Sequence, residues 1–216
     1  MKLSVFLCAK GLYIKGMTSK ENDRLRQNIV QTVLEESAFE PFRLSVILSY
    51  LKQKNVSEQQ FEALYPDGLP QLAQDISDFF DKEMLGKLPT KKPEDMRIRD
   101  AIELGVLTRL EVMMPYKGAV QTLTQYWGKP WTGLKAGKAI WSTVDNIWNW
   151  AGDTSTDYNH YTKRSLLSGV LASTYLYWVS EDDPDLQKTQ GFLARRIENV
   201  MQLGKVIGRF KKKKVS

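Results

Sequence analysis

Apolar residues recur at intervals of three and four positions along most of the chain, which is the spacing of one face of an α-helix. The first half holds three such groups: Leu25, Ile29, Val33 and Leu34, then Leu44, Ile47, Leu48 and Leu51, then Leu72, Ile76, Phe79 and Phe80. No segment alternates apolar and polar residues in the way that predicts a β-strand. The pattern therefore predicts an all-α fold.

A short helix is expected between the second and third groups. Ser57 can cap its amino end, and Pro66-Asp-Gly68 stops it. This order of helices resembles the helix-turn-helix domain of TetR-type regulators, in which the second helix of the pair enters the DNA major groove. Here that helix reads SEQQFEALY, with two glutamates and no cation, so it would repel phosphates. Gln59 and Gln60 remain as candidates for base contacts, and a ligand-responsive regulator is the alternative function.

The sequence GKLPTKKP at residues 86–93 is the best linker candidate. After it, helices are predicted at residues 98–114, 119–126, 135–150, 157–179 and 186–210. We therefore expect a disordered extension at residues 1–19, a degenerate helix-turn-helix bundle at 20–88 and a carboxy-terminal ligand-binding domain at 94–216. Translation from Met17 is the alternative to a start at Met1.

Composition argues against an enzyme. One cysteine leaves neither an internal disulfide nor a thiolate zinc site, and one histidine removes most metal and acid–base schemes. Asp157 and His160 have the spacing of a helical metal site but lack the several partners it needs. No nucleophile elbow, phosphate loop or dinucleotide fingerprint is present. We expect no catalytic residue, no metal and no cofactor.

The net charge of +6 lies in the tail, because Lys205, Arg209 and the run 211–214 account for all of it. An apolar arc along residues 192–210 precedes that run. Together they predict attachment to an anionic membrane surface through Lys205, Arg209, Phe210, Lys211, Lys212, Lys213 and Lys214. The alternative is a last helix that docks on the core. The longest uncharged run, residues 165–180, is 16 residues and too short to span a bilayer.

All six tryptophans lie between residues 127 and 178. The helix after Arg164 is almost wholly apolar, which predicts burial on every side. Its small residues, such as Gly169 and Ala172, leave room for an apolar ligand, and an ordinary filled core is the alternative. The predicted cavity is lined by Trp141, Val144, Trp148, Leu167, Leu171, Tyr175 and Trp178. Asn159, His160 and Tyr161 fall on the exposed first turn and suit a protein interface.

The stretch NIWNWAGDTSTDYNHYTKRSLLSGV, residues 146–170, resembles the signature region of the Coq nine family, the lipid-binding accessory proteins of ubiquinone biosynthesis. The likeness extends over most of residues 95–205. It implies a TetR-like homodimer that does not bind nucleic acid. It also implies a hydrophobic cavity for an isoprenoid quinone intermediate or a phospholipid. The protein would present the membrane-embedded quinone to the di-iron demethoxyubiquinone hydroxylase.

The resemblance also implies a surface that binds this partner, carried over by position to Asp145, Ile147, Trp150, Asp157, His160 and Tyr161. Family members often have tryptophan where this chain has His160, which keeps an aromatic contact but weakens it. The implied location is the cytoplasm, peripheral to the inner membrane in a bacterium, or the matrix side of the mitochondrial inner membrane in a eukaryote.

Overall fold

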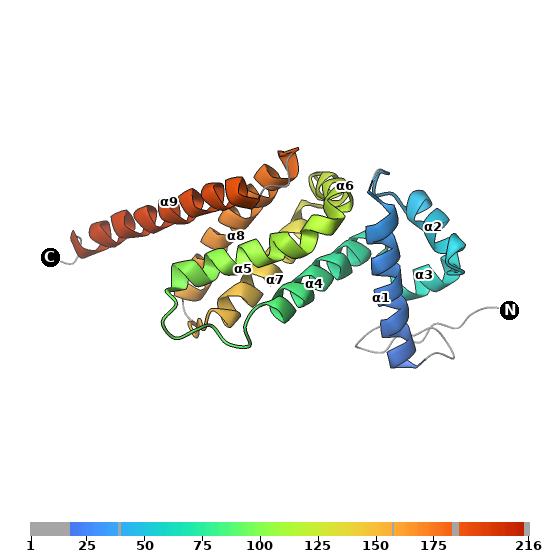
Figure 1. The fold of residues 1–216 in the computed structure, drawn as a ribbon, viewed down its shortest axis with the longest axis horizontal. Helices are drawn as coiled ribbons and strands as arrows, with labels where there is room; N and C mark the ends of the chain where they lie inside the picture. The colour runs from blue at the N-terminus through green and yellow to red at the C-terminus, as the bar shows by residue number, and fades with distance from the viewer. Residues whose placement is uncertain (1–17, 39, 157, 183–185, 214–216) are drawn as a thin grey trace. The chain divides into compact units, whose positions relative to one another are not determined.

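The structure is a computed structural model that describes residues 18–38, 40–156, 158–182 and 186–213 (Figure 1). These residues form helices and no strand, as predicted, and no helix among them combines the length and hydropathy needed to cross a bilayer. The helices are α1 (Ser19–Glu36), α2 (Leu44–Gln53), α3 (Glu58–Leu64), α4 (Leu69–Lys87), α5 (Ile98–Met113), the 3-10 turn η1 (Met114–Tyr116), α6 (Lys117–Trp127), α7 (Gly133–Trp150), α8 (Tyr158–Ser180) and α9 (Leu186–Lys213).

The chain divides into two compact units, each made of two separate stretches. The first unit comprises residues 1–79 and 116–136, and the second comprises 80–115 and 137–216. Helix α4 contributes to both units, so the division does not fall at the predicted linker, which lies inside the second unit. The first unit recruits α6 because Gly118 allows a close approach, where an added Cβ would lie 2.6 Å from the carbonyl oxygen of Ala38.

The first unit contains the expected helix-turn-helix arrangement. Asn55 adopts a positive φ of 59° in the turn between α2 and α3. The predicted cap is confirmed: the Ser57 side chain accepts from the backbone N–H of Gln60 at 3.2 Å. In return, the Gln60 side-chain oxygen accepts from the backbone N–H of Ser57 at 2.8 Å. This reciprocal pair satisfies backbone donors at the start of α3, and it occupies one of the two amides considered for base contacts.

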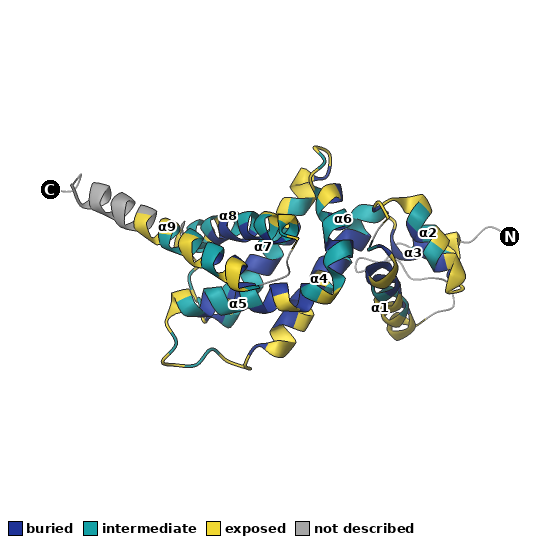
Figure 2. Ribbon diagram, turned by 45° about the horizontal axis from the view of Figure 1, so that its top comes forward, coloured by how far each residue is buried: buried dark blue, intermediate teal, exposed yellow. Residues whose placement is uncertain are grey.

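The second unit packs α5, α7, α8 and α9 with the last part of α4, and Figure 2 shows buried residues along their facing sides. Its most deeply buried apolar side chains include Met84, Leu110, Val144, Ile147, Leu171, Trp178 and Leu193. Gly105 on α5 lets α7 approach closely, since a Cβ there would lie 3.0 Å from Ile147. A buried ion pair also crosses this core, with Arg109 Nε 3.3 Å from Asp81 Oδ1.

The prediction that α8 is buried on every side was wrong. Leu167, Val170, Leu171 and Trp178 are buried, but Leu176 is 61% exposed. Ser165, Gly169 and Ser180 are exposed on the same stripe, at helical spacing from Leu176. A continuous apolar run shows that a helix is apolar in composition. It does not show which sides of that helix pack against other helices. The small residues of α8 therefore lie partly on its surface, in place of opening space inside the core.

Candidate functional site

The turn between α7 and α8 is fixed first by its backbone. Gly152 has a φ of 86°, a conformation that residues with a Cβ rarely adopt. Its N–H donates to the carbonyl of Asn149 at 3.1 Å, and the N–H of Asp153 donates to that of Trp148 at 3.0 Å. These two bonds form a Schellman motif, which ends α7 and turns the chain sharply. The predicted role of Gly152 as a helix terminator is confirmed.

Arg164 on α8 ties this turn to α7. Its side chain is only 2% exposed. Its Nε donates to Asp145 Oδ1 at 2.5 Å, and its Nη1 donates to Asp153 Oδ2 at 3.0 Å. Its Nη2 also donates to the side-chain oxygen of Asn149 at 3.2 Å. A buried guanidinium needs such partners, because an unpaired charge there would be strongly destabilising.

Asp153 is the second centre of this cluster, which we call the Arg164 network and which comprises Asp145, Asn149, Asp153, Lys163 and Arg164. Lys163 Nζ donates to Asp153 Oδ1 at 2.6 Å, and the Ser155 hydroxyl donates to Oδ2 at 2.7 Å. Burial by itself would raise the pKa of Asp153. The hydrogen bonds from Lys163, Ser155 and Arg164 outweigh burial and hold that pKa far below its ordinary value. The carboxyl is therefore ionised throughout the physiological range.

The network positions the two aromatic residues at the start of α8. The His160 ring nitrogen Nδ1 lies 2.9 Å from the carbonyl oxygen of Ser155, so Nδ1 carries the proton in this contact. Tyr161 is 61% exposed, and its ring centroid lies 6.3 Å from that of Trp141. A shallow polar hollow of about 410 Å³ adjoins both residues. It is lined by Asn149, Asp153, Thr154, Ser155, Thr156, His160, Tyr161 and Arg164.

The residues carried over as a partner surface occupy different environments. His160 and Tyr161 line the hollow, whereas Ile147 is wholly buried. Asp145 is committed to Arg164, and the indole N–H of Trp150 donates to the carbonyl oxygen of Pro89 at 2.8 Å. Asp157 lies outside the described residues. Within the predicted set, His160 and Tyr161 are thus the side chains that line this hollow.

A separate, apolar pocket of about 270 Å³ lies among α5, α7, α8 and α9. Trp148 and Leu167 line it, as the predicted cavity set requires. The remaining lining residues are Ile98, Arg99, Ile102, Lys163, Leu166, Val170, Ile197, Val200 and Met201. Sequence reasoning missed the contributions of α5 and α9, although the apolar arc of the last helix contains Ile197 and Val200.

The other predicted cavity residues lie elsewhere. Val144, Leu171 and Trp178 are wholly buried and fill the core. Trp141 lies beside Tyr161, with its ring centroid 6.3 Å from that of the tyrosine. The ring of Tyr175 lies 5.5 Å from the guanidinium carbon of Arg109, and burial raises the pKa of its hydroxyl. The second unit thus contains both an apolar pocket and a filled core, in different places.

The described part of α9 docks on the second unit. Leu193 is wholly buried, and Phe192 stacks on Tyr177 with ring centroids 4.4 Å apart. The predicted membrane-contact residues Lys205, Arg209, Phe210, Lys211, Lys212 and Lys213 belong to the last turns of α9. Their side chains lie outside the described part of the structure, as does the whole of Lys214. Up to Met201, α9 therefore packs on the second unit, as in the alternative to membrane attachment.

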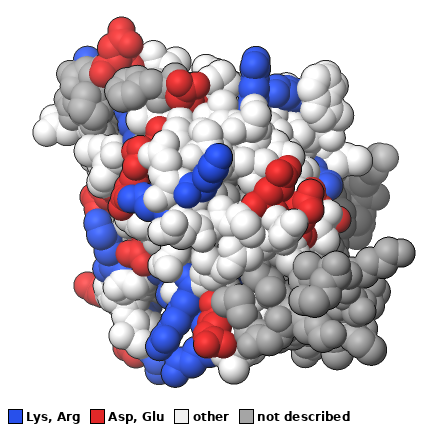
Figure 3. Space-filling model, turned by 90° about the vertical axis from the view of Figure 1, so that its right-hand side faces the viewer, with Lys and Arg blue, Asp and Glu red and all other residues white. Residues whose placement is uncertain are grey.

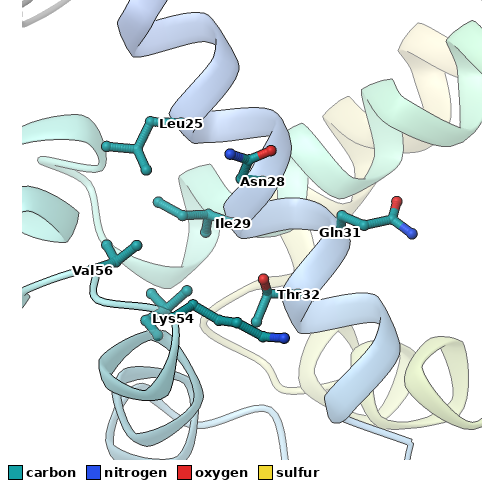
Figure 4. A pocket seen from close by; sticks show the side chains of 8 residues that line it. Leu25, Asn28, Ile29, Gln31, Thr32, Lys54 and Val56 are labelled. Atoms are coloured by element: carbon teal, nitrogen blue, oxygen red, sulfur yellow. The ribbon is translucent and has the colours of Figure 1, made fainter.

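The first unit has a mixed hollow of about 340 Å³ beside α1 (Figure 4). Its floor includes Ile29 and Val56, and its rim includes Asn28, Gln31 and Lys54. On the side of the molecule that carries α1 to α3, acidic and basic side chains are interspersed (Figure 3). Among the described residues, this face thus mixes both signs of charge, whereas DNA-binding surfaces carry clustered cations.

Among known proteins, one that shares the fold of this chain differs from those that share its sequence. A TetR transcriptional regulator from Nitrosomonas europaea has a similar structure, with a TM-score of 0.62 and 19% identity. The match covers 82% of this chain and 97% of that regulator, and it confirms the predicted TetR-like fold. The neighbour's own activity is not transferred with its fold.

Sequence similarity points to a narrower group. Residues 134–204 match the model of the COQ9 family. The mitochondrial ubiquinone biosynthesis protein COQ9 of Bos taurus is 36% identical over 121 residues, covering 53% of this chain and 34% of that protein. The human protein of the same name is 31% identical over 121 residues, covering 53% and 35%. The match thus spans about a third of the length of these relatives. Residues 134–204, which contain the Arg164 network, are therefore similar to the COQ9 family.

Proposed function

We propose that this protein is a non-enzymatic, lipid-binding accessory protein of ubiquinone biosynthesis. It takes a membrane-embedded isoprenoid quinone intermediate, or a phospholipid, into the apolar pocket of its second unit. As a homodimer at the membrane periphery, it presents the quinone to the di-iron demethoxyubiquinone hydroxylase. The family match and the names of the relatives support this pathway. The relatives are named as mitochondrial proteins, and we infer a place beside the mitochondrial inner membrane or its bacterial equivalent.

The apolar pocket is the observation that carries the proposal. Its walls come from four helices, and apolar side chains such as Ile102, Val170 and Ile197 provide most of its surface. A volume of about 270 Å³ lies just below the usual range for small-molecule pockets, about 300–1,000 Å³. The pocket therefore suits the quinone ring with its first isoprene units, while the rest of a long tail stays in the bilayer.

Native mass spectrometry of the purified protein, followed by lipid extraction, tests this part. An isoprenoid quinone or a phospholipid should accompany the wild-type chain. Leu166→Trp should fill the pocket and abolish that mass, because Leu166 lines it. Leu176→Trp is the matched control, since Leu176 lies on the same helix and is exposed. A ligand-free wild type, or equal ligand in both variants, would contradict the proposal.

The hollow beside Tyr161 supports the partner assignment. Tyr161 offers an exposed aromatic ring on a turn held rigidly by the Arg164 network, and rigid aromatic anchors dominate protein interfaces. Tyr161→Lys should weaken binding to the purified hydroxylase by at least ten-fold in surface plasmon resonance. His160→Trp should strengthen it, and Leu176→Lys should leave it unchanged. Unaltered affinity in the Tyr161 variant would remove this surface from the proposal.

A DNA-binding regulator is the second candidate, because the fold is TetR-like. The short helix α3 opposes it, since Glu58 and Glu62 are exposed there and Gln60 is used in the cap. A gel shift with genomic fragments at low and physiological salt separates the two functions. The lipid-binding proposal expects no retarded band at physiological salt. Specific retardation there would favour the regulator.

A further inference from the structure

Two of the largest exposed apolar side chains lie together in the connection between α6 and α7. Trp131 is 77% exposed and Leu134 is 94% exposed. They are three residues apart, Trp131 in the turn and Leu134 in the first turn of α7, so both belong to the same short segment. Large apolar groups seldom remain this exposed on a monomer without a binding role.

The turn is rigid. The hydroxyl of Thr132, which is buried, lies within hydrogen-bonding distance of the carbonyl oxygens of Tyr126 at 2.8 Å and Lys129 at 2.9 Å, either of which can accept its one proton. Its own carbonyl accepts the N–H of Ala136 at 2.9 Å, which anchors the first turn of α7. Pro130 further restricts the backbone. The exposed side chains are thus held outward in advance, so that little conformational entropy would be lost on binding.

Cations flank both apolar residues. Lys129 places its Nζ 5.9 Å from the ring centroid of Trp131, and Lys135 is exposed immediately after Leu134. Between Glu111 and Asp145, the sequence contains four lysines and no acidic residue. The local field is therefore positive throughout this stretch, which complements an anionic surface.

We propose that Lys129, Trp131, Leu134 and Lys135, the Trp131 tip, form a second membrane-contact site that inserts into an anionic lipid bilayer. Tryptophan prefers the membrane interface, leucine the acyl region below it, and lysines the headgroup phosphates. A protein partner fits less well, because two side chains fall far short of the roughly 800 Å² that each side of a stable interface buries. The Trp131 tip lies outside the carboxy-terminal tail that was predicted above to contact the membrane. The inference does not depend on the lipid pocket.

Flotation of the full chain with vesicles tests the inference, using phosphatidylcholine alone and phosphatidylcholine with phosphatidylglycerol. Trp131→Ser/Leu134→Ser should reduce partitioning onto anionic vesicles by at least ten-fold. Lys129→Gln/Lys135→Gln should reduce it about five-fold for each lysine. The controls are Leu176→Ser for an exposed leucine and Lys52→Gln/Lys54→Gln for exposed lysines, and both should bind as the wild type.

Each variant is also made in a chain whose lysines 211–214 are changed to glutamine, so that the contribution of the tail is separated. Brominated acyl chains should quench wild-type fluorescence more than that of Trp131→Phe. Equal vesicle binding of tip variants and wild type in both backgrounds would overturn the inference. Unchanged vesicle binding with an altered sedimentation coefficient of Trp131→Ser/Leu134→Ser would also overturn it, and would assign the tip to contact between copies of the chain.

Discussion

The turn between α2 and α3 and the turn between α7 and α8 are stabilised by different kinds of interaction. Between α2 and α3, Ser57 and Gln60 exchange backbone and side-chain hydrogen bonds within four residues of sequence, at an exposed site. Between α7 and α8, a buried guanidinium collects carboxylates and an amide from residues that lie 11 to 19 positions before it. The first turn needs only a local capping sequence. The second needs particular charges in particular places.

This difference explains how far each kind of similarity reaches. The likeness to a TetR regulator covers 82% of the chain at 19% identity, because many sequences can cap and pack the same helices. The family match is confined to residues 134–204, which contain every member of the Arg164 network. A buried ion cluster tolerates few substitutions, since each removal leaves an unpaired charge. The residues matched to the family include the buried cluster, whereas the capped turn between α2 and α3 lies outside them.

The largest effect should follow loss of Arg164. Arg164→Met keeps much of the side-chain volume but leaves Asp145 without its cation and Asp153 with Lys163 alone. We expect a loss of about 3–5 kcal/mol in the free energy of unfolding, measured by urea denaturation. Hydrogen exchange should increase first in peptides from the start of α8. A loss below 1 kcal/mol would mean that the network does not stabilise the second unit.

Lowering the pH should change the free energy of unfolding in opposite directions through one carboxyl group in each unit. Hydrogen bonds lower the pKa of Asp153, so its contribution is complete above about pH 4 and is lost as the pH falls below that value. Burial raises the pKa of Asp75, although Arg26 partly offsets the effect. Since folding raises that pKa, the contribution of Asp75 to stability increases as the pH falls toward 4.

Urea denaturation of two asparagine variants between pH 7 and pH 3 measures this contrast. Asp153→Asn should lose about 2 kcal/mol at pH 7, and the difference from wild type should shrink below pH 4. For Asp75→Asn, the wild type should gain stability relative to the variant as the pH falls. Parallel curves for the two variants would refute the assignment of opposite pKa shifts.

Removing the cap of α3 should have a smaller effect. Ser57→Ala deletes the hydroxyl that accepts the Gln60 N–H, and we expect a loss of about 1 kcal/mol in thermal or urea unfolding. Ser49→Ala, at another exposed serine on α2, is the control and should stay within about 0.5 kcal/mol. Equal losses in both would show that the cap contributes nothing particular to this turn.

The smallest effect is expected at the ion pair of the first unit. Arg26 Nε lies 2.9 Å from Asp75 Oδ2, but both side chains are partly exposed. Arg26→Met should therefore cost about 0.5 kcal/mol in urea denaturation, against several for Arg164→Met. Comparable losses of stability in the two arginine variants would show that the partly exposed ion pair and the buried network do not differ in their contribution.

Much of this arrangement follows from local sequence. The spacing of Ile29 and Val33, the Ser57 cap and the Gly152 terminator each depend on residues a few positions apart. The position of Arg164 does not, because nothing in the sequence shows that its partners lie 19 residues earlier on α7 and 11 residues earlier in the turn that follows it. The apolar pocket was predicted in part, since Trp148 and Leu167 line it. Its α5 and α9 walls arise from tertiary packing, which periodicity cannot assign.

Binding of an isoprenoid quinone to the second unit tests the central claim most directly. Isothermal titration calorimetry in detergent should compare the wild type, Leu166→Trp and Leu176→Trp with a short-chain ubiquinone. The account predicts saturable, one-site binding to the wild type and to Leu176→Trp, and a loss of at least ten-fold in affinity for Leu166→Trp. Absence of binding to the wild type, or equal binding to all three, would contradict it.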